Sequence, residues 1–321
     1  MVPVSRRYFL AGLCTAAATA AAFRPTRAAS ATPVFKISVL TDEISQDFAH
    51  ACEVASQEFG LSYVELRAMH DKNVMVWDRH DIDEALAVLK RFNLQVSEIA
   101  SPIFKVDWPG APLSKFRPKG PQFGADFTVV QQDALIDHAI DVAKTFKAPY
   151  IRIFDFWRLD DQTPYRAAMD DRIRQAAVRA GKKGMTLTLE NELDCNTATG
   201  AEAARLLNAV KETSLMLNWD PGNATARGEK AFPDGYSKLP TGRIGHVHCK
   251  DASPKPDGGT TWACMGRGMI DWTGQFKALM ADGYRGAVSL ETHWQGGGTH
   301  EESSRQSMAG MKELLARAGA L

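Results

Sequence analysis

Four segments of this 321-residue chain share one design, in which a short apolar, β-branched stretch ends in a carboxylate or a histidine. The terminal residues are Glu190, Asp220, His248 and Glu291, so that about one strand–helix unit separates each from the next. Because the C-terminal ends of parallel barrel strands meet on one face, the three carboxylates and the imidazole would converge there. Such a donor set predicts a site for one divalent metal ion, with Mn²⁺ as the first choice and Mg²⁺, Co²⁺ or Zn²⁺ as alternatives.

Two histidines compete for one place in this predicted set. His246 and His248 are two residues apart on the same predicted strand and therefore face the same side. The site needs one of them, and His248 lies nearer the C-terminal end of the strand. We therefore assign His248 as the metal ligand and expect His246 to contact the substrate.

The elements that must position these residues alternate between two periodicities. Helical spacing predicts helices at 48–59, 82–92, 127–146, 164–180, 201–211, 271–281 and 301–318, and an irregular segment at 221–240. A long Pro- and Gly-rich loop at 101–126 indicates a functional segment. Apolar runs predict eight strands, at 35–40, 62–66, 94–100, 150–154, 185–190, 215–220, 243–248 and 286–291.

Eight such units predict an α/β fold, a closed (β/α)₈ TIM barrel. An open, doubly wound sheet is the alternative, but no Gly-x-Gly-x-x-Gly motif follows the first predicted strand.

The N-terminal segment predicts export. Residues 5–10 read Ser-Arg-Arg-Tyr-Phe-Leu, a twin-arginine signal, and an Ala-rich apolar run follows at 11–23. That run is shorter than the roughly 20 residues that span a bilayer. We therefore predict a twin-arginine signal peptide at 1–30, one catalytic TIM-barrel domain at 31–321, and a periplasmic protein without a membrane anchor after processing.

Composition narrows the function further. The formal net charge is zero and no long basic run occurs after the signal, which argues against binding to nucleic acid or membrane surfaces. Cys52, Cys195, Cys249 and Cys264 form no Cys-x-x-Cys pair, so we expect unpaired or buried thiols. Whether the chain forms a homo-oligomer stays open.

Five motifs in the C-terminal half carry a family resemblance. In this order they resemble the xylose isomerase-like TIM-barrel superfamily, the sugar isomerase and epimerase group. Tyr-Val-Glu-Leu-Arg at 63–67 is similar to the family as well. The motifs are Leu-Glu-Asn-Glu at 189–192, Asn-Trp-Asp-Pro-Gly-Asn at 218–223, His-Val-His-Cys-Lys-Asp at 246–251, Gly-Arg-Gly-Met-Ile-Asp-Trp at 266–272, and Gly-Tyr-Arg-Gly-Ala-Val-Ser-Leu-Glu at 283–291.

The resemblance implies roles for the four strand-end residues. Glu190, Asp220, His248 and Glu291 would bind one divalent metal ion. Glu190 and Glu291 would also be catalytic, one removing a proton from the carbon next to a sugar carbonyl and the other returning one on the opposite face. The metal would stabilise the enediolate formed between these two steps.

One departure and several rim residues concern the substrate. Relatives often carry Asp-x-x-His where this chain has Asp220 to Asn223, which makes a multinuclear site less favoured, while Asn223 can still bond a sugar hydroxyl. Indole rings after strands suit the apolar face of a sugar ring. The further substrate-binding candidates after predicted strands are Arg67, His70, Lys250, His293, Trp108, Trp157, Trp262 and Trp294.

The function predicted from these residues is a metal-dependent isomerase or epimerase. It would transfer a proton next to a carbonyl, and export favours a small non-phosphorylated sugar or keto-sugar, because sugar phosphates are cytoplasmic. The alternative is a metal-dependent lyase or hydrolase that cleaves 3-keto-glycosides by β-elimination. Less favoured are an apurinic-site endonuclease, which would need more histidine ligands, and a non-catalytic sugar-binding protein, which would not need two metal-bound glutamates.

Overall fold

Eight parallel strands form one nearly closed ring in the computed structural model, which describes residues 33–118 and 126–321. The strands are hydrogen-bonded in the order β1-β12-β9-β8-β7-β6-β5-β2, and a parallel bridge between Leu40 and Glu65 joins the two ends. The predicted (β/α)₈ barrel is thereby confirmed. The strands are β1 (Lys36–Val39), β2 (Tyr63–Leu66), β5 (Gln95–Ile103), β6 (Tyr150–Ile153), β7 (Thr186–Glu190), β8 (Leu215–Trp219), β9 (Ile244–Cys249) and β12 (Ala287–Leu290).

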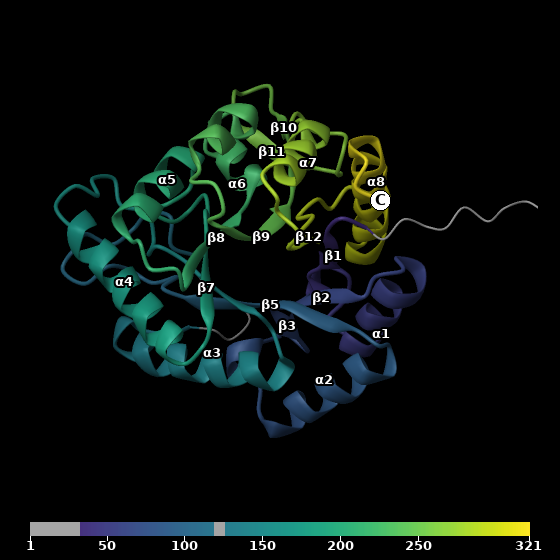
Figure 1. The fold of residues 1–321 in the computed structure, drawn as a ribbon, viewed down its shortest axis with the longest axis horizontal. Coiled ribbons are helices and arrows are strands. Elements are labelled where there is room, and N and C mark those ends of the chain that lie inside the picture. The colour runs from purple at the N-terminus through teal and green to yellow at the C-terminus, as the bar shows by residue number, and fades with distance from the viewer. Residues whose placement is uncertain (1–32, 119–125) are drawn as a thin grey trace, which may run out of the picture. The chain divides into compact units, whose positions relative to one another are not determined.

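Helices surround this ring (Figure 1). Capping residues in the sequence mark some of their N-termini, since Thr199 and Glu202 form a capping box at one helix and Asp271 accepts from the backbone of Gly274 at another. The helices are α1 (Phe48–Glu53), α2 (Arg79–Arg91), α3 (Gln132–Phe146), α4 (Arg166–Lys182), α5 (Gly200–Ala209), α6 (Pro221–Ala226), α7 (Trp272–Ala281) and α8 (His300–Ala318).

Two small hairpins at the C-terminal ends of the strands extend the barrel. The first pairs β3 (Ala68–Met69) with β4 (Lys72–Asn73), and the second pairs β10 (Asp251–Pro254) with β11 (Thr260–Ala263). The second hairpin carries Trp262 back towards the mouth of the barrel. Both hairpins follow barrel strands directly, so they shape the face on which the predicted site residues lie.

The interior of the ring is polar, whereas the layer between strands and helices is apolar. TIM barrels usually fill the interior with Val, Ile and Leu. Here each strand contributes a polar side chain that is at most 5% exposed. These residues contact one another, as when Thr188 and Asn218 both donate to Glu98. The eight residues are Ser38, Glu65, Glu98, Arg152, Thr188, Asn218, His246 and Ser289.

The predicted signal peptide and the predicted absence of a membrane anchor are the two expectations that concern membranes. Within residues 33–118 and 126–321, no helix is long and apolar enough to cross a bilayer. The predicted signal peptide at 1–30 lies outside the described residues.

Candidate metal centre and cleft

The four predicted metal ligands converge at the C-terminal ends of their strands. Glu190 ends β7, His248 lies in β9, and Glu291 directly follows β12. Asp220 follows β8 and caps α6, where it accepts from the backbone of Asn223 at 2.8 Å. One donor atom from each of the four lies within 4.8 Å of the others, and all four residues are at most 2% exposed.

The imidazole of His248 faces the three carboxylates through Nδ1. That atom is 3.3 Å from Glu190 Oε1, 3.3 Å from Glu291 Oε2 and 3.8 Å from Asp220 Oδ2. Three carboxylate oxygens and one ring nitrogen therefore surround a common point, which is the donor chemistry that suits Mn²⁺, Zn²⁺ and related divalent ions.

Charge and hydrogen bonding both fit a divalent cation at this point. Glu190 Oε2, Asp220 Oδ2 and Glu291 Oε2 are buried and accept no hydrogen bond, although each has an ion-pair contact. A divalent ion would balance an excess of negative charge in this part of the barrel. Among the described residues, the carboxylates in and around the centre outnumber the lysine and arginine side chains that contact them. The carboxylates are Asp42, Glu43, Glu65, Glu190, Asp220 and Glu291, and the cationic side chains are Arg67, Arg152 and Lys250.

Three cationic side chains hold the carboxylates in place. The Lys250 ammonium, 1% exposed, lies 3.0 Å from Asp220 Oδ2 and 2.6 Å from Glu291 Oε2. Arg152 Nη1 is 3.0 Å from Glu190 Oε2, and Arg67 Nη1 is 2.8 Å from Glu291 Oε1. Each glutamate therefore has an arginine of its own, which restricts its rotation.

Burial and these neighbours shift the pKa values in opposite directions. Burial alone would raise the pKa of Glu190, but His248 and Arg152 outweigh it and lower this pKa to about 2. The pKa of Glu291 is likewise held well below its usual range, by Lys250, His293 and His248, despite burial. Burial raises the pKa of Asp220 to about 6, because Lys250 only partly offsets it and the two glutamates add to it.

His248 behaves differently. Burial would lower its pKa, but Glu65, Glu190 and Glu291 together raise it well above the usual range. In the metal-free protein, the imidazole is therefore protonated at neutral pH. A metal ion that binds to Nδ1 must displace a proton.

A cleft of about 1160 Å³ opens above the centre. Of the predicted residues, Arg67, Trp262, Glu291 and His293 line it. Trp262 also covers Lys250, whose Nζ is 5.1 Å from the indole ring. The cleft has further lining residues that were not predicted, among them Asp42, Glu43, Lys105, Arg152, Phe154 and Glu192.

Asn223 lies below the cleft and contacts the ligands instead of open space. It is fully buried, its Nδ2 donates to Glu190 Oε1 at 3.1 Å, and its Oδ1 accepts from Lys250 at 3.3 Å. The predicted contact of Asn223 with a sugar hydroxyl therefore has no counterpart in this geometry. Lys250, 1% exposed, shares this buried position.

His246 also lies below the cleft. Two residues along a strand correspond to about 6.6 Å, so His246 sits one layer deeper than His248 and is fully buried. Its neighbours are Glu65, Glu98 and Asn218. This depth removes it from the space in which we expected it to contact the substrate.

Four other candidates are not among the described residues that line the cleft. Trp108 packs edge-on against Phe156, and Trp157 is buried beside Phe154 and Cys195. His70 pairs with Glu84 at 3.2 Å on the surface, and Trp294 is half-buried. Their position after strands was not sufficient to bring them to the site.

Several buried partners were missed, although the sequence holds a signal for them. The residue two positions before each ligand is also polar, as in Thr188 before Glu190 and Ser289 before Glu291. Because strand side chains alternate, this pattern indicates a polar barrel interior. The same alternation makes Arg152 point inward from the otherwise apolar β6.

Asp251 joins two of the motifs that looked separate in the sequence. Its carboxylate accepts from the backbone N–H groups of Gly266 and Gly268 at 3.0 Å and of Ile270 at 3.4 Å. A Cβ at Gly268 would lie 2.1 Å from Asp251 Oδ1. The aspartate therefore anchors a glycine turn and leaves Lys250 alone to face the ligands.

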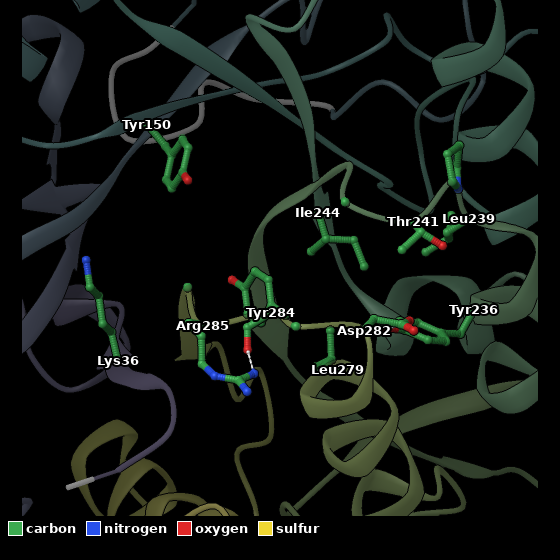
Figure 2. Close-up of a pocket in the computed structure, with 14 residues that line it drawn as sticks. Lys36, Tyr150, Tyr236, Leu239, Thr241, Ile244, Leu279, Asp282, Tyr284 and Arg285 are labelled. Carbon is green, nitrogen blue, oxygen red and sulfur yellow. Dashed lines mark hydrogen bonds between the residues drawn. The ribbon is translucent and has the colours of Figure 1, made fainter.

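A second pocket of about 410 Å³ lies at the opposite end of the barrel (Figure 2). It is lined by strand beginnings, including Lys36, Tyr150 and Ile244. Its Tyr236 hydroxyl donates to Asp282 at 2.7 Å, so these polar groups satisfy each other. Because TIM barrels place chemistry at the C-terminal face, the cleft above the four ligands is the candidate active site.

Fold and site together define a (β/α)₈ barrel with a buried cluster of four residues that could hold a metal ion. Residues 54–314 match the family described as xylose isomerase-like TIM barrel, and the chain belongs to this family. No curated protein matches the chain.

Solved structures share the fold at low identity. The IOLI protein with a bound zinc atom has a TM-score of 0.69 at 16% identity, with 89% of this chain and 98% of that chain covered. The probable 3-DHS dehydratase AsbF from Bacillus anthracis has 0.64 at 21%, with 87% and 98% covered. D-allulose 3-epimerase from Methylomonas sp., in complex with D-allulose, has 0.63 at 16%, with 89% and 98% covered.

Proposed function

We propose that this protein is a divalent-metal-dependent sugar isomerase or epimerase that moves a proton at the carbon next to a carbonyl. The observation that carries the proposal is the convergence of two buried glutamates, Glu190 and Glu291, on one cation-binding centre, each with its own arginine. The named activity of the allulose epimerase and the zinc atom of the IOLI structure support it.

The side chains of this centre have separate tasks. Glu190, Asp220, His248 and Glu291 would hold the ion, which supplies polarisation of the substrate carbonyl and its neighbouring hydroxyl. Glu190 and Glu291 lie on strands separated by β8 and β9, so they reach a substrate from different sides. One removes a proton from carbon and the other returns one to the opposite face.

The protein keeps both glutamates ready to accept a proton. Both are ionised at neutral pH, because nearby cations hold their pKa values low. Arg152 and Arg67 fix their orientations at 3.0 Å and 2.8 Å. Such low pKa values make each carboxylate a weak base, so the reaction depends on a C–H that a polarised carbonyl acidifies.

The cleft suits a hydroxyl-rich substrate. Its wall is mostly polar and charged, and Phe154 and Trp262 give it apolar faces of the kind on which a sugar ring packs. We propose a non-phosphorylated sugar or keto-sugar as the substrate. The preceding signal peptide and periplasmic location, which support an unphosphorylated substrate, are part of this proposal.

One observation favours the second candidate, β-elimination from a 3-keto-glycoside. The cleft volume of about 1160 Å³ exceeds the roughly 300–1,000 Å³ that holds a drug-sized ligand. A glycoside with a second group beyond the reacting sugar would use this space. One of the similar folds is named a probable dehydratase, and dehydratases eliminate water.

Solvent-deuterium incorporation tests both candidates. The purified protein, loaded with Mn²⁺ or Zn²⁺, is incubated with free ketoses, aldoses and 3-keto-glycosides in D₂O and followed by NMR. We expect deuterium at the carbon next to the carbonyl, together with an epimer or isomer. Release of the aglycone would instead identify the lyase.

A surface variant serves as the control for this experiment. Glu84→Gln changes an exposed carboxylate that pairs with His70 away from the cleft and should react like the wild type. Product without deuterium at early times would contradict proton transfer and indicate a hydride shift. No product with any metal or sugar would contradict the proposed function.

A further inference from the structure

His248 lies between two groups of buried carboxylates and uses a different ring nitrogen for each. Nδ1 faces Glu190, Asp220 and Glu291. Nε2 faces Glu65 on β2, with Oε1 at 3.0 Å and Oε2 at 3.2 Å. Both His248 and Glu65 are fully buried, so water does not compete for this contact.

In a neutral imidazole only one of the two nitrogens carries a proton, so the protonation of one nitrogen determines that of the other. A metal ion at Nδ1 needs that nitrogen without a proton, so the proton of the neutral ring must lie on Nε2. A buried N–H needs an acceptor. Glu65 lies on the Nε2 side of the ring and is not part of the cluster of metal-ligating atoms that includes Glu190, Asp220 and Glu291. It is therefore an acceptor for the ring and not one of the four ligands.

We propose that Glu65 is a positioning residue for the metal centre: it accepts the Nε2 proton of His248 and thereby keeps Nδ1 directed at the ion. This inference rests on the metal-binding part of the proposed function. It explains why β2 carries a fully buried carboxylate inside the barrel, a residue that neither the cleft nor the four-ligand set uses.

Asn218 offers the competing arrangement. Its Nδ2 lies 3.1 Å from His248 Nε2. If the amide donated to Nε2, the proton of the neutral ring would move to Nδ1 and block the metal. The same Nδ2 also donates to Glu98 Oε2 at 3.0 Å through its other hydrogen. Glu65 offers Nε2 two carboxylate oxygens, at 3.0 Å and 3.2 Å, and a hydrogen bond to a carboxylate is stronger than one from a neutral amide. Nε2 therefore donates to Glu65.

The alternative interpretation is that the buried residues around Glu65 bind a second cation. Donor atoms of Glu65, Glu98, His246 and His248 also lie within 4.8 Å of one another. His246 Nε2 is buried, accepts or donates no hydrogen bond, and lies 3.7 Å from Glu65 Oε2. The two readings differ in the number of ions bound, so one experiment separates them.

The test compares Glu65→Gln with Glu98→Gln in the whole protein. Zn²⁺ is titrated into each metal-free protein in competition with a chromophoric chelator, which gives affinity and stoichiometry without any substrate. Loss of a second-layer partner typically weakens metal binding about 10–100-fold, and we expect a loss in this range for Glu65→Gln. Glu98→Gln removes a carboxylate from the same buried cluster, but it should bind Zn²⁺ within about threefold of wild type.

Two further measurements keep the test independent of folding. Glu65→Asp keeps the charge and withdraws it by one methylene, so its affinity should lie between wild type and Glu65→Gln. Nitrogen-15 NMR of the ring should show the Nε2–H form of His248 in the zinc-loaded wild type. A general loss of folding would not produce this order.

Three outcomes would overturn the inference. Glu65→Gln could bind Zn²⁺ as tightly as wild type, or the zinc-loaded ring could carry its proton on Nδ1. Alternatively, wild type could bind two ions and both Gln variants only one, which would establish the second cation site. All three are read without turnover, so they leave the isomerase proposal to its own experiment.

Discussion

Replacing Lys250 by methionine should destabilise the metal-free protein, and a bound divalent ion should restore most of the loss. The ammonium is 1% exposed and lies within 3.0 Å of both Asp220 and Glu291. Methionine keeps much of the side-chain bulk but leaves two buried carboxylates without this cation. Breaking a buried pair in this way costs about 3–5 kcal/mol.

The expected cost lies at the lower end of that range. Burial already raises the pKa of Asp220 to about 6, so this carboxyl can take up a proton once the ammonium is gone. We therefore expect a loss of about 3 kcal/mol at pH 7. At about 2 °C per kcal/mol for a large domain, the melting temperature should fall by roughly 6 °C.

Calorimetry with and without saturating Zn²⁺ measures the effect. Lys183→Met is the matched control, because Lys183 pairs with Asp137 on the surface at 2.8 Å and is 41% exposed. An exposed pair of this kind contributes only about 0–1 kcal/mol. An equal loss with and without Zn²⁺ would show that Lys250 acts through packing, and no loss at all would refute the charge argument.

Three further predictions follow from the same centre and from the N-terminal sequence. With metal saturating, Glu190→Gln and Glu291→Gln should lower the initial rate of deuterium exchange about 10²–10⁴-fold, whereas Asp220→Asn should recover as metal is raised; recovery of the Gln variants would contradict their role as bases. Metal binding should release about one proton more at pH 5 than at pH 8, because Asp220, with its pKa raised to about 6, is protonated at the lower pH, so metal affinity should fall more steeply with pH below about 6. Calorimetry in buffers of different ionisation enthalpy counts these protons, and equal release at both pH values would refute the assignment. Protein recovered from the periplasm should begin between Ala28 and Thr32 by N-terminal sequencing, and a full-length chain confined to the cytoplasm would contradict export.

The barrel could be predicted because its strands are short apolar runs bounded by glycine, proline or helix caps. The eight predicted strands agree with the observed ones to within three residues at each end, as in β7 and β12. The β10–β11 hairpin was not predicted. Asp257-Gly258 is a typical hairpin-turn pair, but the residues around it are polar, so the two short strands were not recognised.

The site was harder to predict, because it depends on how deep each side chain lies in the barrel and on the path that each loop takes. Strand ends identified Glu190 and Glu291 as neighbours, but nothing in a linear pattern states that His246 lies one layer too deep for the cleft. The cleft wall depends on how loops return, so Lys105 and Glu192 lie there while Trp157 turns into the core.

The closure of the ring between β1 and β2 has a consequence for how an ion enters. Seven junctions of the barrel are hydrogen-bonded ladders, whereas this one has a single bridge, from Leu40 to Glu65. Arg67 reinforces it with ion pairs to Asp42, Glu43 and Glu291, each at 2.8 Å. Ion pairs therefore stabilise the junction at which backbone pairing is reduced to one bridge.

Such a junction is where local opening requires the least free energy. Amide protons of β1 and β2 should exchange with solvent before those of β7 and β8, which are paired by ladders on both edges. The carboxylate partners of Arg67 are at most 5% exposed, so salt screens these ion pairs little and should change the opening of this junction little. The rate at which metal loads into ligands that are at most 2% exposed would then depend on the opening of this one junction as well as on diffusion through the cleft.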